Sequence, residues 1–348
     1  MSIKKIIGIL GVSILTTSLV CGCSLNSKND SLQTTTIFAM DTVMELQVAG
    51  DESLLADSVQ MITDLENKLS VTSDTSEIGI LNSKKEAALS EETTDILEKA
   101  LEVCKETDGD LDISIYPVLK AWGFTTSEYR VPEDEEIDNL KAFVDYRKIN
   151  ENRKEEGSLV TIPQDMEIDL GSIVKGYTGS KLSSFYRENG VKSALINLGG
   201  NVECIGTKPN GQPWNVAVKS PFLDSKSGIY GVIKASDEAI ITSGGYERYF
   251  ESNGEIYWHI LDPKTGKPAK SGLSSVTVIG KDGLLCDGLS TALFVKGLDD
   301  AIAYWKTRDD FDFVFITDEG QVFISEGIAD RFTLSSEYHD APLTVVTK

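Results

Sequence analysis

The chain has 348 residues, of which 41% are hydrophobic, and it carries a formal net charge of −22 at pH 7. This excess of acidic residues argues against nucleic acid as a partner, because binding nucleic acid rests on neutralising phosphates with Lys and Arg. The length is ample for a large core, and an acidic protein can still bind a phosphate ligand where a metal ion or a few cations offset the local repulsion.

The chain opens with two lysines and an apolar stretch, Ile6–Val20, which ends at Val20-Cys21-Gly22-Cys23. This pattern predicts an export signal over residues 1–22. The last four residues resemble a bacterial lipobox, in which a small residue precedes the lipidated cysteine, so Cys23 is the predicted lipidation site and first mature residue; Cys21 fits less well. An uncleaved membrane anchor is the alternative, although the stretch is shorter than the roughly 20 residues of a spanning helix.

Residues 23–35 are rich in Ser, Asn, Lys and Thr, a composition that predicts a flexible tether to the outer face of the cell membrane. The folded domain is then predicted to cover residues 36–348. Removing residues 1–22 takes away two lysines and no acids, so the net charge of −22 becomes −24. The remaining cysteines, Cys104, Cys204 and Cys286, are too widely spaced for a zinc motif or a disulfide framework.

The spacing of apolar residues predicts a strand over 36–49 and a helix over 51–69. Further helices are predicted over 91–107, just after Pro117, and over 175–189, where Gly190 gives a stop signal. Strands follow at 194–197, 214–219, 229–234, 239–242, 246–251, 255–261 and 275–279. Helices at 287–295 and 298–305 and strands at 311–316 and 321–324 complete an α+β pattern with no linker that would divide it.

The segment Ile168–Tyr177 is predicted to run from a strand through Gly171 into a helix, which exposes backbone groups to a phosphate. Asp169 and Lys175 flank the helix start. The segment has neither the Gly-Lys-Ser/Thr of a Walker loop nor a GxGxxG fingerprint. It therefore indicates either an anion or nucleotide site or an ordinary strand-to-helix connection.

Other polar residues lie near turns. Asp110 and Asp112 offer two carboxylates, and the glycine turns at 197–201 and 242–246 allow either close approach of a ligand or simple sharp bends. His259 lies at a predicted strand end, where it can face a cleft or be satisfied by a backbone carbonyl.

Asp287 and Thr291 are four residues apart where a helix is predicted to begin. That spacing puts both oxygens on one helical face. Two protein oxygens suit Mg²⁺, which usually keeps waters and substrate phosphates as its other ligands. The alternative is an Asp near an N-cap, followed by an ordinary helix.

In their order along the chain, seven of these segments resemble motifs of the ApbE family, the FAD:protein FMN transferases, which are flavin-trafficking lipoproteins. The resemblance extends from about Phe38 to Gly297, and its segments are Met40-Asp41-Thr42, Asp110–Ile113, Asp169–Tyr177, Asn197–Gly200, Thr242–Gly244, His259–Gly266 and Cys286–Thr291. Each segment alone is modest, but seven in one order are specific. The resemblance implies a single large domain of mixed sheets and helices, an α+β fold that is T-fold-like.

The resemblance also implies FAD as substrate and Mg²⁺ as cofactor, with Asp287 and Thr291 as side-chain ligands and Ser172 supplying a backbone carbonyl. The positions that match FAD contacts in the family are Met40, Asp110, Leu111, Asp112, Asp169, Lys175 and His259. Asp41 stands where the family usually has Gly, and Cys286 where it usually has Ala.

In the implied reaction, a threonine hydroxyl of an exported FMN-binding acceptor protein attacks the FMN phosphorus of FAD, and AMP leaves. His259 is the candidate that accepts the hydroxyl proton, since a neutral imidazole suits near-neutral pH. Lys175 is expected to stabilise phosphate charge, and Asp287 to act through the metal. Two alternatives are hydrolysis of FAD to FMN and AMP, with water as acceptor, and a non-catalytic flavin-binding lipoprotein.

Overall fold

The computed structural model describes residues 31–348. Its strands are β1 (Leu32–Ala39), β2 (Thr42–Ala49), β3 (Glu86–Leu89), β4 (Asn150–Arg153), β5 (Ser158–Thr161), β6 (Ser193–Leu198), β7 (Asn201–Gly206), β8 (Trp214–Lys219), β9 (Ile229–Ala235), β10 (Ala239–Gly244), β11 (Tyr249–Ser252), β12 (Glu255–Trp258), β13 (Leu261–Asp262), β14 (Lys267–Pro268), β15 (Leu273–Gly280), β16 (Phe311–Thr317), β17 (Val322–Ser325), β18 (Phe332–Leu334) and β19 (Leu343–Val346). Its helices are α1 (Ser53–Leu69), α2 (Glu77–Lys84), α3 (Glu91–Glu106), α4 (Tyr116–Trp122), α5 (Asp134–Lys141), α6 (Val174–Glu188), α7 (Gly283–Lys296) and α8 (Leu298–Trp305), with short 3₁₀ helices at Ile113–Ile115, Tyr146–Lys148 and Glu326–Ile328.

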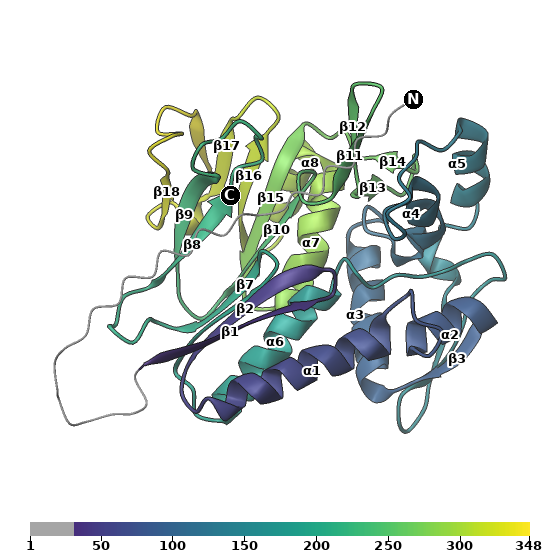
Figure 1. Ribbon diagram of the computed structural model, residues 1–348. Helices are drawn as coiled ribbons and strands as arrows, with labels where there is room; N and C mark the ends of the chain where they lie inside the picture. The colour runs from purple at the N-terminus through teal and green to yellow at the C-terminus, as the bar shows by residue number, and fades with distance from the viewer. Residues whose placement is uncertain (1–30) are drawn as a thin grey trace.

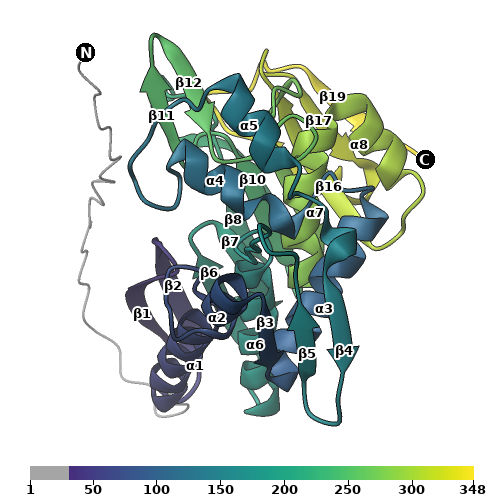
Figure 2. The same cartoon turned by 90° about the vertical axis from the view of Figure 1, so that its right-hand side faces the viewer.

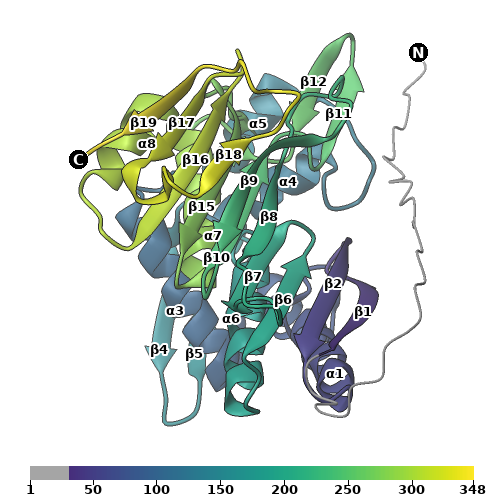
Figure 3. The same cartoon turned by 90° about the vertical axis from the view of Figure 1, so that its left-hand side faces the viewer.

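A nine-stranded sheet, in the order β1-β2-β6-β7-β10-β15-β16-β17-β19, forms the framework of the described part of the chain (Figure 1). Its strands pair antiparallel except β17 and β19, which are parallel. Helices α6 and α7 cover one face, and the small sheet β18-β9-β8 covers part of the other (Figure 3). The central strands are therefore buried on both sides.

A second lobe, built from α2, α3, the C-terminal end of α1 and the small sheet β3-β5-β4, packs beside α7 (Figure 2). The first turns of α1 pack on β2, β6 and α6, whereas α4 and α5 pack with β11 and β13. The apolar core of the second lobe includes Leu81, Ile96 and Val160, and it continues into Leu284 and Ala292 of α7. Both lobes thus share one core, and the chain folds as a single α+β domain, as predicted.

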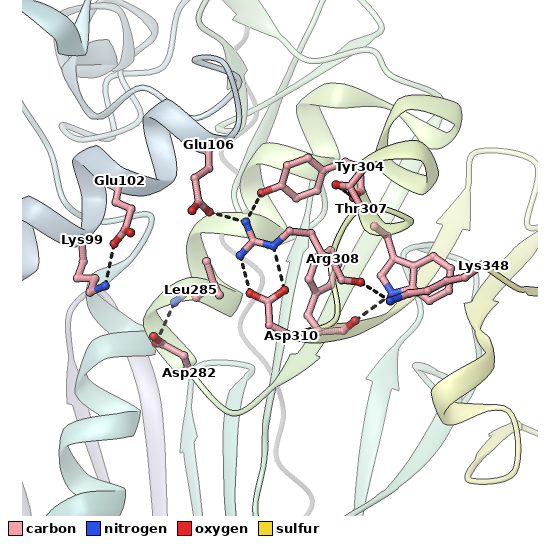
Figure 4. Close-up of polar contacts among 12 residues, drawn as sticks. Lys99, Glu102, Glu106, Asp282, Leu285, Tyr304, Thr307, Arg308, Asp310 and Lys348 are labelled. Carbon is pink, nitrogen blue, oxygen red and sulfur yellow. Dashed lines mark hydrogen bonds and ion pairs between the residues drawn. The ribbon is translucent and has the colours of Figure 1, made fainter.

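Arg308 joins α3 to the end of α8, as Figure 4 shows. Its guanidinium donates to Glu106 at the end of α3, with an N–O distance of 2.6 Å, and to the hydroxyl of Tyr304 at 3.1 Å. The same group pairs with Asp310, 2.5 Å away. The Arg308 side chain thus connects the end of α3 with the segment between α8 and β16.

The predicted strand over 36–49 is instead a hairpin. Met40 and Asp41 both have positive φ, 48° and 59°, which is the geometry of a tight turn that matches strand twist. The hairpin pairs from Leu32 opposite Ala49 onwards, so residues 32–35 belong to the first strand and the predicted tether is wrong for them. Three successive β-branched threonines in that stretch favour a strand.

Other predicted boundaries shift by smaller amounts. Helix α7 begins at Gly283, where Asp282 caps it by accepting the Leu285 N–H at 3.1 Å. Asp287 therefore lies in the second turn, five residues after the cap, so the helix starts before the predicted residue 287 and the alternative interpretation of Asp287 as an acid near an N-cap does not hold. Residues 167–170 are coil rather than a strand. The export signal and Cys23 fall outside the described residues, and none of the helices within residues 31–348 is long and apolar enough to span a membrane.

Candidate functional site

Two glycines bring α6 and α7 into contact. A Cβ atom on Gly176 would lie 2.1 Å from the carbonyl oxygen of Gly283 and 2.7 Å from the Cβ of Asp287. Glycine at this position lets the two backbones touch. The Gly176 N–H then donates to Oδ2 of Asp287 at 2.8 Å, and Asp287 is only 3% exposed. The start of α6 thereby orients the carboxylate that was predicted to bind metal.

Thr291 follows Asp287 by one turn, as the helical spacing predicted. The hydroxyl of Ser243, at the end of β10, lies 2.7 Å from the hydroxyl of Ser290 and 3.3 Å from that of Thr291. Ser290 also donates to the main-chain carbonyl of Asp287 at 2.8 Å. Ser243 belongs to the second glycine turn, so that turn positions the helix that carries both oxygens.

A cavity of about 320 Å³ opens at this end of the sheet. All the predicted site residues within residues 31–348 line it, namely Met40, Asp110, Leu111, Asp112, Asp169, Ser172, Lys175, His259, Asp287 and Thr291. They come from the β1–β2 turn, the loop after α3, the segment before α6, the β12–β13 connection and α7. The structure thus brings these segments together around one cavity, and the roles predicted for their residues stay predictions.

The cavity wall also contains residues that the sequence did not single out. The polar ones include Glu66, Ser70, Thr72, Thr125, Glu247 and Arg248. Glu66 accepts the N–H of Met40 at 2.7 Å and so supports the β1–β2 turn. Glu247 and Arg248 directly follow the glycine turn at 242–246, which is the only signal that pointed towards them.

Two acids of the wall have structural partners. The carboxylate of Asp110 lies 2.8 Å from Nζ of Lys264 and 2.5 Å from Nζ of Lys296. Asp112 caps a 3₁₀ helix by accepting the N–H groups of Ser114 at 2.9 Å and Tyr146 at 3.1 Å. These side chains hold the wall in shape, and their contacts with FAD stay a prediction.

His259 combines the two roles that its sequence position allowed. The carbonyl of Arg248 lies 3.1 Å from the backbone N of His259 and 3.2 Å from its Nδ1. With the proton on Nδ1 donated to that carbonyl, Nε2 keeps a lone pair. Burial, together with the charges of Arg248 and Lys175, lowers the pKa of His259 to about 3. The imidazole is therefore neutral at pH 7.

Two carboxylates in the cavity, Asp287 and Asp169, lie near cationic side chains. Burial raises the pKa of Asp287, against the influence of the Lys175 ammonium and the Gly176 N–H. Burial likewise raises the pKa of Asp169, while the Gly171 N–H, Arg248 and Lys175 oppose the rise. The positive charge of Lys175 thus acts on both carboxylates. The same charge would attract an anionic ligand in this part of the cavity.

The oxygen donors in the second and third turns of α7, Asp287 and Thr291, fit a hard cation. Within residues 31–348, no three His, Cys, Asp or Glu side chains come together to hold a metal. If a cation bound between Asp287, Thr291 and the Ser172 carbonyl, the protein would supply only one carboxylate ligand. Water or ligand oxygens would have to fill the rest of the coordination sphere, which is the usual arrangement for Mg²⁺. In the same cavity, the side-chain amide of Asn201 lies close enough to Asp287 to oppose the rise in the pKa of that carboxylate.

Fold and site together define an α+β protein whose cavity is lined by carboxylates, a lysine, an arginine and a histidine. The family model described as "ApbE family" matches residues 40–315, and the chain belongs to that family. The family predicted from the sequence motifs is thereby confirmed.

Relatives extend the match over most of the chain. An FAD:protein FMN transferase of Klebsiella pneumoniae (strain 342) is 32% identical over 83% of this chain and 90% of its own length. One from Haemophilus influenzae is 28% identical over 96% of this chain and 99% of its own. Among solved structures, the ApbE protein of Thermotoga maritima is similar with a TM-score of 0.78 at 29% identity, covering 85% of this chain and 98% of that one. The flavin transferase ApbE of Vibrio cholerae gives 0.75 at 25%, covering 86% and 100%.

Proposed function

We propose that this chain is an Mg²⁺-dependent FAD:protein FMN transferase that attaches FMN to a threonine of an exported acceptor protein and releases AMP. The observation that carries the proposal is the meeting of the predicted FAD and metal residues in one cavity. The similar proteins of Klebsiella pneumoniae and Haemophilus influenzae are FAD:protein FMN transferases, which supports the transferase class. The metal, the acceptor threonine and the leaving group rest on the chemistry of the site.

The metal residues have distinct tasks in this proposal. Asp287 and Thr291 provide side-chain oxygens and Ser172 a carbonyl oxygen for the cation. When bound, Mg²⁺ supplies Lewis-acid polarisation of the phosphoryl oxygens and neutralises developing charge. Lys175 adds a second positive charge on the same side of the cavity. Gly176 keeps Asp287 in place through its N–H.

His259 is the proposed proton acceptor. The acceptor hydroxyl oxygen bonds to the FMN phosphorus, the bond from that phosphorus to the bridging oxygen breaks, and AMP leaves with that oxygen. The hydroxyl proton moves to Nε2 of His259, which is available because Nδ1 faces the Arg248 carbonyl. A pKa near 3 makes the empty-site imidazole a weak base, but the negative pyrophosphate raises the pKa of a nearby imidazole.

The proposed location is the outer face of the cell membrane, with a lipid on Cys23 as the anchor. An enzyme held there meets exported flavoproteins and the FAD available outside the cytoplasm. Residues between Cys23 and Leu32 form the remaining spacer between the lipid and the first strand.

The experiment uses the full chain in detergent with FAD, an FMN-binding acceptor domain, and either Mg²⁺ or EDTA. The proposal predicts an acceptor that keeps flavin fluorescence on a denaturing gel, one AMP per flavin attached, and neither in EDTA. AMP and free FMN with a dark acceptor band would favour the hydrolase, and intact FAD would favour a flavin-binding protein.

A further inference from the structure

Arg248 lies on the loop between β10 and β11 and reaches across the mouth of the cavity. Its Nη1 is 3.4 Å from the carbonyl oxygen of Phe124, and its Nη2 is 3.9 Å from Oδ2 of Asp41. Both distances are long for hydrogen bonds to a charged group, which favour 2.7–2.9 Å. The guanidinium is thus held loosely between two separate loops.

Asp41 is the partner on the other side of the mouth. It occupies the β1–β2 turn, which the Met40 contact with Glu66 supports from below. Its side chain is 82% exposed, so this ion pair is weak and sensitive to salt. Asp41 and Arg248 both line the cavity, and a ligand that enters between them passes their charges.

The charge of Arg248 also reaches the interior. After burial, it is the largest influence that lowers the pKa of His259, and it counteracts the raised pKa of Asp169. Lys175 acts on the same two groups. Two cations therefore act on His259 and Asp169. Lys175 lies at the start of α6, and Arg248 lies on the loop between β10 and β11.

This arrangement suits a ligand with two linked phosphates. A guanidinium offers a planar fork that matches phosphate oxygens in pairs, whereas an ammonium acts as a point charge. We infer that Arg248 binds the pyrophosphate of FAD and that Asp41 is the counter-ion which the guanidinium leaves when FAD enters. The inference rests on FAD being the ligand of the proposed function.

Two consequences distinguish these roles. Removing the guanidinium costs affinity only for ligands that carry phosphate. Removing the Asp41 charge frees the guanidinium and increases affinity for FAD, because bound phosphate no longer competes with a carboxylate. The main-chain carbonyl of Arg248 holds His259 whichever side chain is present, so substitutions of the side chain leave that contact in place.

The test measures dissociation constants by quenching of flavin fluorescence, with the full chain, Mg²⁺ and no acceptor, and with FAD verified as intact by chromatography. Arg248→Gln is expected to weaken FAD binding about 10-fold or more and to leave riboflavin binding unchanged. Arg248→Lys should recover part of the loss. Asp41→Asn is expected to tighten FAD binding about two- to five-fold at low salt, with the gain lost at high salt.

A double-mutant cycle connects the two residues. In the Arg248→Gln background, Asp41→Asn should leave the FAD dissociation constant unchanged. The exposed pair of Arg187 and Asp237 at the far end of α6 gives matched control variants, Arg187→Gln and Asp237→Asn, which should not alter binding. Unchanged FAD affinity in Arg248→Gln, or weaker binding in Asp41→Asn, would overturn the inference. If affinity follows these expectations but no FMN is transferred, the inference stands and the proposed function fails.

Discussion

Alanine at Gly176 is expected to damage catalysis far more than stability. The new Cβ would lie 2.1 Å from the Gly283 carbonyl oxygen, more than about 1 Å inside normal contact, so α6 and α7 must separate. Overpacking of this kind costs about 1–3 kcal/mol, and the better helix propensity of alanine returns about 1 kcal/mol. The net loss of unfolding free energy is then about 0–2 kcal/mol.

The effect on activity follows from Asp287, because the Gly176 N–H donates to its carboxylate. A displacement of about 1 Å at a catalytic group can cost about 100-fold in rate. The assay compares kcat, the Mg²⁺ concentration for half-maximal rate, and Tm. Gly179→Ala, one turn later in α6, is the matched control, since its Cβ would approach only side chains, Oε2 of Glu203 at 3.1 Å and Cδ1 of Leu198 at 3.9 Å. Wild-type kcat and Mg²⁺ dependence in Gly176→Ala would refute this account of how Asp287 is held.

The remaining predictions concern the metal, the base and a buried acid. Asp287→Ala and Thr291→Ala should each reduce FMN transfer strongly, and added Mg²⁺ should rescue only the milder variant; unchanged turnover in both would contradict the metal assignment. His259→Ala should keep its affinity for FAD but turn over slowly, and loss of binding would instead make His259 a structural residue. Burial raises the pKa of Glu203 from 4.5 to about 7, so between these values the unfolded chain loses the proton while the folded chain keeps it. Glu203 alone should therefore lower the free energy of unfolding by about 3 kcal/mol as pH rises through that window, in addition to the contribution of Glu247, whose pKa burial also raises to about 7. Denaturant titrations at pH 5 and pH 7.5 check this, and an equal fall in Glu203→Gln would contradict it.

The sequence predicted the site better than the elements that carry it. Asp287 and Thr291 were paired correctly from helical spacing, although α7 begins four residues earlier than expected. The residue that caps α7 is Asp282. Because Asp282 and Asp287 are both aspartates near the start of the same apolar segment, residue type alone did not show which one is the cap. Asp169 reached the cavity from coil instead of from a strand.

Elements with weak local signals were missed. The β1–β2 turn uses Met40 and Asp41 in a left-handed conformation, which non-glycine residues rarely adopt, so a hairpin looked like one strand. Helices α2 and α5 and the strands β3, β4 and β5 are short, and α5 opens with Asp134, Glu135 and Glu136 and buries only Ile137. Arg248 belongs to no motif, and only tertiary structure brings it opposite Asp41.

The central claim is that FMN is transferred to a protein threonine, and the most direct measurement is the intact mass of an acceptor domain after incubation with the enzyme, FAD and Mg²⁺. The account predicts a mass gain equal to FMN in phosphoester linkage, AMP released in equal amount, and no gain when the acceptor threonine is replaced by valine. An unmodified acceptor beside free FMN and AMP would contradict it.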